Sequence, residues 1–296
     1  MTTFTLAHLS DPHLAPLPKP RLHELAGKRA LGYLNWKRNR HAIHRRDVLD
    51  AIVADVRAQS PDHIAVTGDL VNLALPDEFT QARVWLDSVG LPNDVTVIPG
   101  NHDAYVASAR HRIADWLDFS RGDTADAATV PTFPFVRRRG PLTLIGVSSA
   151  MPTAPFMATG TLGPEQLDAL DRTLSQLADD AGFRVLLIHH PLTSASSYKR
   201  LTDADALLAL IKRHRIDLIL HGHDHIHSTM WLEGPHGRVP AVGVPSASAV
   251  AHGHYPAAAY NLFSITRDGD GWHCEQRVRG FGDGTRIEEL QRIQLI

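Results

Sequence analysis

The sequence predicts an α/β fold in which two β-sheets pack face to face and helices cover their outer surfaces. Two patterns carry this prediction. Strand-like and helix-like segments alternate as far as Leu220, and from Thr229 onward strand-like segments follow one another directly. The chain has 296 residues and is 43% hydrophobic, which is enough to bury the core of one large domain or of two small ones.

The first part of the chain alternates short apolar strands with amphipathic helices. Residues His44–Ala58 show the 3.6-residue periodicity of a helix. Further along, Pro99-Gly100 ends the predicted strand Val95–Ile98. In chain order, the predicted strands are Thr3–Leu9, His63–Thr67 and Val95–Ile98, and the predicted helices are His44–Ala58, Asp77–Val89 and Ala107–Phe119.

The second part continues this alternation and then changes to β-structure. Pro164 suits the first turn of a helix, where its missing N–H would have no partner. The predicted helices are Pro164–Asp179 and Asp203–His214, and the predicted strands are Arg184–Ile188, Ile216–Leu220, Thr229–Leu232, Val239–Val244, Ala259–Thr266 and Trp272–Val278.

The composition argues against several classes of protein. A formal charge of −2 and a pI near 6.8 give no general attraction to nucleic acid or to an anionic membrane, so we expect no sequence-specific nucleic-acid binding. The single cysteine, Cys274, excludes an intramolecular disulfide and fits a reducing compartment, which predicts a cytoplasmic protein. The segment MTTFTLAHLSDPHL lacks the features of a secretory signal, and no segment has the roughly 18 apolar residues of a membrane-spanning helix.

Side chains that bind metals follow five of the predicted strands. The candidates are Asp11, His13, Asp69, Asn101, His189, His223 and His225. Because ligands of α/β proteins gather where strands end, we expect these side chains to lie close together. Oxygen and imidazole donors without thiolate suit divalent or trivalent ions of Mn, Fe, Zn or Co, and the two oxygens of Asp69 could bridge two such ions.

The segment Gly100-Asn101-His102-Asp103 is the most specific of these clusters. The amide oxygen of Asn101 can bind a hard cation without adding charge. His102 is then free to act as an acid or a positioning group, and the carboxylate of Asp103 could accept its ring N–H and set its tautomer. The alternative is an ordinary polar turn.

Two histidine runs follow the later strands. His189 is the better metal candidate of the pair His189-His190, and His190 would face substrate or a carbonyl group, or be an ordinary core histidine. Histidines alternate at positions 221, 223, 225 and 227, so an extended segment places them on one side, where two of them could each reach a different ion. The alternative for this run is a surface tract that scavenges metal.

Taken together, these motifs resemble those of the calcineurin-like metallophosphoesterase family. They occur in the family's order and span about three quarters of the chain, as Asp11 with His13, Gly68-Asp69, Gly100 to Asp103, His189 to Pro191 and Gly222 to His225. The resemblance implies a four-layer α/β/β/α sandwich of two mixed sheets, and we expect residues 1–296 to form a single domain. Within the family, the chain looks most similar to the small bacterial phosphodiesterases, including the cyclic-nucleotide type.

The same resemblance implies roles for individual residues. One metal ion would bind to Asp11, His13, Asp69 and His225, and a second to Asp69, Asn101, His189 and His223. His102 matches the histidine that contacts the phosphate or the leaving group, and Asp103 is its expected partner. His221 and His227 fall outside the matched motifs and receive no ligand role.

An insertion at about residues 14–46 separates the first cluster from the first predicted helix. Arginine and lysine are frequent in it, and apolar residues recur at helical spacing, as Leu22, Leu25, Ala26, Ala30, Tyr33 and Leu34. It could be a basic amphipathic cap in which residues 19–46 contact an anionic or lipid-like substrate. The interpretation we favour is a helix packed on its own domain with a solvated basic face.

Two further segments are ambiguous. Arg137–Arg139 is interpreted as the solvated edge of a strand or turn. His252, His254 and Tyr255 follow a stretch rich in glycine, alanine and serine, and we favour a surface loop over a place in a substrate cleft.

The candidate ligands predict a phosphoester hydrolase with two metal ions. Two cations about 3.5–4 Å apart lower the pKa of a bridging water, orient it toward phosphorus and offset charge on the phosphoryl oxygens. The main hypothesis is a phosphodiesterase acting on a small organic or nucleotide phosphodiester. The alternatives are a pyrophosphatase for a nucleotide–lipid diphosphate, a phosphomonoesterase, and a non-catalytic metal-binding scaffold. A scaffold would be expected to lack ligands, whereas all seven candidates are present.

Overall fold

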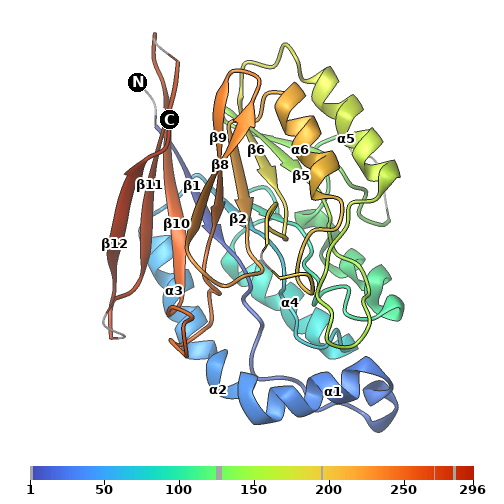
Figure 1. The fold of residues 1–296 in the computed structure, drawn as a ribbon. Coiled ribbons are helices and arrows are strands. Elements are labelled where there is room, and N and C mark those ends of the chain that lie inside the picture. Colours follow the sequence, from blue (N-terminus) through green and yellow to red (C-terminus); the bar gives the residue numbers. More distant parts are fainter. Residues whose placement is uncertain (1–2, 125–128, 195, 270, 283–284) are drawn as a thin grey trace.

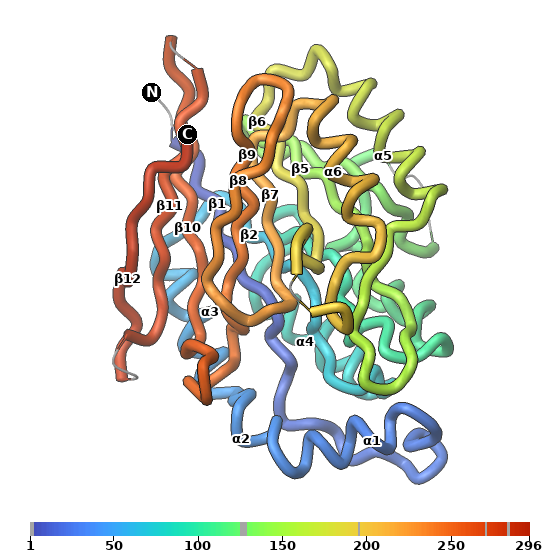
Figure 2. Tube along the Cα trace, viewed as in Figure 1, coloured from blue at the N-terminus to red at the C-terminus, as the bar shows by residue number. Residues whose placement is uncertain are grey.

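The computed structural model describes residues 3–124, 129–194, 196–269, 271–282 and 285–296. Two six-stranded sheets pack face to face, and helices cover the outer face of each sheet (Figure 1; Figure 2). The predicted four-layer α/β/β/α sandwich of two mixed sheets is therefore confirmed. No helix in this part of the chain is both long and apolar enough to cross a membrane.

The first sheet joins the start of the chain to its end. In spatial order its strands are β12 (Ile287–Gln294), β11 (Trp272–Phe281), β10 (Ala259–Arg267), β1 (Phe4–Leu9), β2 (His63–Val66) and β3 (Val95–Val97). The pairs β1–β2 and β2–β3 are parallel, and the other pairs are antiparallel. The carboxyl ends of β1, β2 and β3 therefore lie at one edge of the sheet.

The second sheet comes from the middle of the chain. In spatial order its strands are β4 (Phe135–Arg139), β5 (Leu142–Gly146), β6 (Phe183–Leu187), β7 (Leu218–His221), β9 (Gly237–Gly243) and β8 (Ser228–Gly234). The four inner strands are parallel, and β4 and β8 pair with them in the antiparallel sense. The carboxyl ends of β6 and β7 thus also lie side by side.

Three apolar clusters hold the four layers together. The helices α3 (Arg46–Ala58), α4 (Pro76–Val89) and η3 (Ala107–Phe119) pack on the first sheet, and Trp85 of α4 is fully buried. On the second sheet pack α5 (Pro164–Gln176) and α6 (Ala204–Arg213), which bury leucines such as Leu174. A third cluster that includes Leu6 and Val185 fills the space between the sheets. Burial of these apolar side chains is the main driving force for the layered arrangement.

The insertion folds as a chain of short helices beside the end of the sandwich, lowest in Figure 1. Its elements are η1 (Leu22–Leu25), α1 (Lys28–Asn35), η2 (Trp36–Arg40) and α2 (His41–Ile43). The buried side chain of Trp36 anchors it, and Arg29 donates from Nε to the carbonyl oxygen of Leu73 (3.0 Å). The predicted apolar face is only partly covered, because Leu31 and Leu34 are each 45% exposed.

Three strands, β4, β5 and β12, were not predicted from the sequence. The sequence of β12, IEELQRIQ, is rich in glutamate, glutamine and arginine, which favour helix over strand. It nevertheless extends as an edge strand because it pairs with β11. The predicted helix Ala107–Phe119 is a 3₁₀ segment whose helical geometry is interrupted at Trp116 (φ −125°, ψ 34°).

The interpretation of Arg137–Arg139 as a solvated edge is wrong for Arg137. Arg137 is part of β4, and its side chain is buried. The guanidinium donates to the carbonyl oxygens of Val95 (2.7 Å) and Asp118 (2.9 Å). These acceptors offset the cost of burying a cation. The alternation of strand side chains explains the difference, because Arg138 on the opposite face is exposed.

Candidate metal centre

The loops after β1, β2, β3, β6 and β7 meet where the two sheets end, and they bring all seven candidate ligands together. Backbone hydrogen bonds tie these loops to one another. Asp11 N donates to Gly68 O (3.0 Å), which joins the first two loops, and Gly222 N donates to His189 O (3.1 Å), which joins the last two. The first sheet therefore supplies one side of the cluster and the second sheet supplies the other.

Five of the seven candidate ligands have a left-handed backbone conformation, which is uncommon for residues other than glycine. They are Asp11 (φ 53°), His13 (φ 36°), Asp69 (φ 56°), His223 (φ 70°) and His225 (φ 56°). In the described part of the chain, only Ser60, Ala74 and Phe156 share this property among non-glycine residues. Such strain is stored at functional sites, where it aims side chains that an ordinary turn would point elsewhere.

Two glycines allow the loops to approach so closely. A Cβ atom on Gly100 would lie 2.2 Å from Oδ1 of Asp69, and a Cβ atom on Gly222 would lie 1.9 Å from Oγ of Ser10. Both distances are far inside van der Waals contact. Any larger residue at either position would push the candidate ligands apart.

Around His13, four side chains of types that bind cations face one another, and among them His225 donates from Nε2 to Oδ1 of Asp11 (3.0 Å). The Nδ1 atom of His13 lies 3.2 Å from Val71 O and donates to it, so its Nε2 atom carries a lone pair. That lone pair lies 3.3 Å from Nε2 of His225, 3.7 Å from Oδ2 of Asp69 and 3.8 Å from Oδ1 of Asp11. Four side chains of this kind around one point fit a cation.

The same arrangement recurs around His189. Its Nδ1 atom donates to Thr67 O (2.6 Å), which turns Nε2 toward the cluster. That atom lies 3.1 Å from Oδ1 of Asn101 and 3.5 Å from Oδ2 of Asp69. Nδ1 of His223 lies 2.9 Å from the same oxygen of Asn101. Oδ2 of Asp69 is therefore common to both groups of side chains, as a bridging carboxylate would be.

The buried carboxylates and histidines of the cluster shift one another's pKa. Burial tends to raise the pKa of the Asp69 carboxyl, but the charge on His189 outweighs it and holds the pKa below its usual range. Likewise, burial tends to lower the pKa of His189, yet Asp69 and Asp11 raise it to about 10. Buried carboxylates need a positive partner. A bound cation would replace the proton on His189 in that role.

His102 lies beside the cluster and faces the open side. Its backbone N–H donates to Oδ1 of Asp69 (2.7 Å), and its ring Nδ1 donates to Asn72 O (2.6 Å). The Nε2 atom lies 3.1 Å from Nη1 of Arg40 and accepts from it. Burial, followed by the charge of Arg40, lowers the pKa of His102 to about 4.

The prediction that His102 donates a hydrogen bond to Asp103 is wrong, because its ring donates to the carbonyl oxygen of Asn72 instead. The carboxylate of Asp103 accepts four backbone N–H groups, from Gly100 (2.8 Å), Asp69 (2.9 Å), Leu70 (3.0 Å) and Val71 (3.1 Å). Burial and the charge of Asp69 raise its pKa to about 7, against the effect of these donors. Asp103 therefore fastens two ligand loops together and does not set the tautomer of His102.

Two residues of the site were missed by the sequence analysis, and both come from the insertion. Arg40 reaches His102, and its Nη2 atom lies 3.5 Å from Nε2 of His44. His44 groups with His13 and His225 within 4.8 Å, and its ring stacks on Trp36 (centroids 6.4 Å apart). The many arginine and lysine residues of the insertion indicated that it could contact an anionic substrate. No pattern in the sequence distinguished Arg40 or His44 from its other basic residues.

The remaining histidines have separate places. Nδ1 of His190 lies 2.7 Å from Oγ of Ser149, and Nε2 lies 3.2 Å from Ala158 O, so both nitrogens are occupied within the protein. His190 thus faces a carbonyl group, which was one of its open interpretations. His221 is buried with Nδ1 3.3 Å from Gly222 O.

A cleft of about 430 Å³ opens onto the cluster. Its lining includes His13, Asp69, Asn101, His102, His223 and His225, together with Asn35, Asn39, Arg40 and His44 of the insertion. His252 and Tyr255 also line it, so the interpretation of that segment as no more than a surface loop is wrong for these two residues. The insertion forms one wall of the cleft. It packs on its own domain, as the favoured interpretation has it, but Arg40 lines the cleft and does not belong to a solvated basic face.

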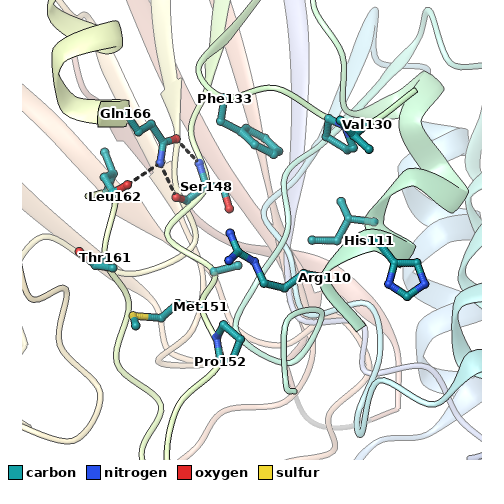
Figure 3. Close-up of a pocket in the computed structure, with 13 residues that line it drawn as sticks. Arg110, His111, Val130, Phe133, Ser148, Met151, Pro152, Thr161, Leu162 and Gln166 are labelled. Carbon is teal, nitrogen blue, oxygen red and sulfur yellow. Dashed lines mark hydrogen bonds between the residues drawn. The ribbon is translucent and has the colours of Figure 1, made fainter. Parts of the chain in front are cut away.

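A separate hollow of about 610 Å³ shares no lining residue with this cleft (Figure 3). Arg110, Met151 and Pro152 line it, and the side chain of Gln166 is held there by Ser148 and Leu162. None of the described residues that line it is a carboxylate or one of the seven candidates. We therefore place the chemistry in the cleft and not in this hollow.

Comparison with known proteins agrees with this geometry. A model of the calcineurin-like phosphoesterase family matches residues 4–227. A probable cyclic nucleotide phosphodiesterase of Synechococcus sp. is 27% identical over 182 residues, which cover 59% of this chain and 62% of that protein. A probable cyclic nucleotide phosphodiesterase of Rhodococcus erythropolis is 26% identical over 235 residues, which cover 77% of this chain and 67% of that protein. The match thus spans less than two thirds of the Synechococcus protein.

Two solved structures share the fold. A dimetal phosphatase from Danio rerio superposes with a TM-score of 0.61 at 13% identity, over 98% of both chains. The purple acid phosphatase PPD1 from yellow lupin seeds superposes with a TM-score of 0.65 at 12% identity, over 99% of this chain and 53% of that chain. At such identities the likeness concerns the fold alone.

Proposed function

Because the chain belongs to the calcineurin-like phosphoesterase family, we propose that it is a phosphodiesterase that uses two metal ions to hydrolyse small organic or nucleotide phosphodiesters. The observation that carries the proposal is the convergence of seven side chains of types that bind metals around two points that share Oδ2 of Asp69. The names of the two curated relatives support a diester substrate. Cys274 is buried, and we keep the cytoplasm as the proposed location.

The proposed ligands fall into two overlapping sets. Asp11, His13, Asp69 and His225 would hold one ion, and Asp69, Asn101, His189 and His223 would hold the other. Mn, Fe, Zn and Co suit this mixture of oxygen and imidazole donors. When bound, the ions supply an activated water and positive charge for the phosphoryl oxygens.

The protein's own residues orient and stabilise the reacting group. His102 keeps Nε2 toward the cleft because Asn72 O holds its other ring nitrogen. Once a substrate separates it from Arg40, Nε2 can take up a proton from solvent and donate that proton to the departing ester oxygen. Asp103 keeps the loops of Asp69 and Asn101 in register through its four backbone hydrogen bonds. The cleft walls hold the ester in line with the cluster.

A substrate panel tests the proposal. The metal-loaded protein is assayed in parallel with bis(p-nitrophenyl) phosphate, p-nitrophenyl phosphate, cyclic AMP and a UDP-lipid, and bound metals are counted. We expect turnover of at least one diester well above that of the monoester. Turnover of the monoester alone would contradict a diesterase, and turnover of the UDP-lipid alone would favour a pyrophosphatase. A protein with two bound ions that hydrolyses none of them would be a metal-binding scaffold.

A further inference from the structure

A second cleft of about 440 Å³ continues from the cleft at the metal centre into the insertion. The residues common to both clefts are Asn35, Arg40, Asn101, His102 and Ala158. The two clefts therefore adjoin, and a substrate held at the metal centre could extend into the second cleft. Its remaining wall comes from α1 and from the loop that carries Pro155, Phe156 and Met157.

Two cations stand along this cleft without a carboxylate partner among the described residues. The guanidinium of Arg40 contacts only histidine nitrogens, on His102 and His44. Nζ of Lys28 donates to Oγ1 of Thr153 (2.8 Å) and to Met157 O (3.3 Å), and it lies 4.3 Å above the ring of Tyr105. The charge of Asp69 acts on both cations from a distance, but their hydrogen bonds go only to neutral groups, and partly buried cations of this kind favour the arrival of an anion.

The far end of the cleft is apolar and exposed. Leu31 on α1 is 45% exposed and Phe156 is 86% exposed, although both line the cleft. Phe156 also has a left-handed backbone (φ 66°), which is an outlier for a bulky aromatic residue. A strained backbone thus holds an apolar side chain in water beside a cleft lined by cations. Exposed apolar groups of this kind mark a binding surface that an apolar ligand would cover.

We propose that the second cleft is a subsite for an apolar second substituent of the phosphodiester, with Arg40 at the junction holding a phosphoryl oxygen. The inference rests on the proposed function for the position of phosphorus at the metal centre. It adds the substrate class, namely amphiphilic phosphodiesters with an anionic group and an apolar tail. Of the aromatic rings that line this cleft, Trp36 already stacks on His44 and Tyr105 on His102, which leaves Phe156 as the exposed ring.

Ligand binding without turnover tests the subsite. Calorimetry on the metal-loaded protein measures the Kd of methyl, butyl and octyl phosphate below their aggregation concentrations. Burial of an apolar chain should tighten binding by about twofold to fourfold per methylene for those that enter the cleft. Equal Kd values for methyl and octyl phosphate would overturn the subsite, whether or not the protein hydrolyses any diester.

Paired variants locate the effect. Leu31→Ser and Phe156→Ser should reduce the ratio of methyl to octyl Kd, whereas Leu22→Ser, in the same insertion but 92% exposed and outside the cleft, should keep the wild-type ratio. Equal ratios in all three variants would overturn the assignment of the apolar end. Melting temperature and metal content, measured for each variant, establish that it is folded and loaded.

Arg40 needs its own comparison. Arg40→Gln should weaken binding of all three alkyl phosphates by a similar factor, at least about tenfold, because a charged hydrogen bond is lost. Arg40→Lys keeps the positive charge and should recover part of the lost affinity. The matched control is Arg38→Gln, an exposed arginine on the same η2 segment. Unchanged binding in Arg40→Gln, or an equal loss in Arg38→Gln, would overturn the role of Arg40.

Discussion

Nη1 of Arg40 lies 3.1 Å from Nε2 of His102, so a cation from the insertion contacts the histidine beside the metal centre. The two residues are far apart in the sequence, and only the packing of η2 against the loop after β3 joins them. This contact makes the insertion part of the proposed active site. It also keeps Nε2 of His102 free of a proton until an anion takes up the charge of Arg40.

Loss of the shared carboxylate should remove both metal ions. In Asp69→Asn the Oδ2 position that faces His13 and His189 loses its charge, so we expect little bound metal and activity at least about a hundredfold lower. Metal analysis by mass spectrometry of the purified protein measures this. Asp11→Asn, which belongs to only one proposed ligand set, should keep one ion. Retention of two ions by Asp69→Asn would refute the bridging position.

His102→Ala should separate catalysis from metal binding. The ring touches Asn72 and Arg40 but is outside both proposed ligand sets, so we expect two ions to remain and kcat to fall about 10²–10⁴-fold. Steady-state kinetics and metal analysis on the same preparation give both quantities. His111→Ala, at an exposed histidine, is the control. An ion-free His102→Ala protein would place this histidine among the ligands.

Asp103→Asn should act through stability. Asparagine would point an N–H₂ group at backbone donors that now bond to the carboxylate, which leaves buried N–H groups unsatisfied. We expect the free energy of unfolding to fall by about 2–4 kcal/mol. Urea denaturation measures it, with Asp168→Asn on the exposed face of α5 as the control. A variant as stable as wild type, with reduced kcat alone, would restore the catalytic assignment of Asp103.

Buried His63 should make the protein sensitive to acid. Burial, with a smaller effect of Arg137, lowers its folded pKa from 6.5 to about 3, so between these values only the unfolded chain binds the proton. Stability from this group is therefore complete above pH 6.5 and falls by about 1.4 kcal/mol per pH unit as the pH drops toward 3.

The measurement is the free energy of unfolding at several pH values from about 6 to 4. His63→Gln should reduce the slope by about that amount, although the loss of the bond to Thr96 lowers stability at every pH. His236→Gln, at an exposed position, should leave the slope as in wild type. A slope that does not change in His63→Gln would show that His63 binds its proton equally in both states.

The alternating segments were sufficient to predict most of the fold. Apolar periodicity identified β1, β2, β3, β6 and β7 because those strands are buried on both faces. Two of the three missed strands are edge strands: the side chains of β12 meet solvent, and in β4 the charged side chain of Arg137 turns inward. The third, β5, is a buried inner strand. Pairing with a neighbour, and not local composition, decides whether such segments become strands.

By itself, the sequence determined the candidate ligands and the reaction class, because metal donors are few in kind and their motifs keep a fixed order along the chain. Only the tertiary structure decided what surrounds them. It moved Asp103 from the ring of His102 to four backbone amides, and it brought Arg40, His44 and Tyr255 to the cleft. The physical reason is that hydrogen-bond partners across the end of a sandwich depend on how distant loops meet, a relation that no local pattern contains.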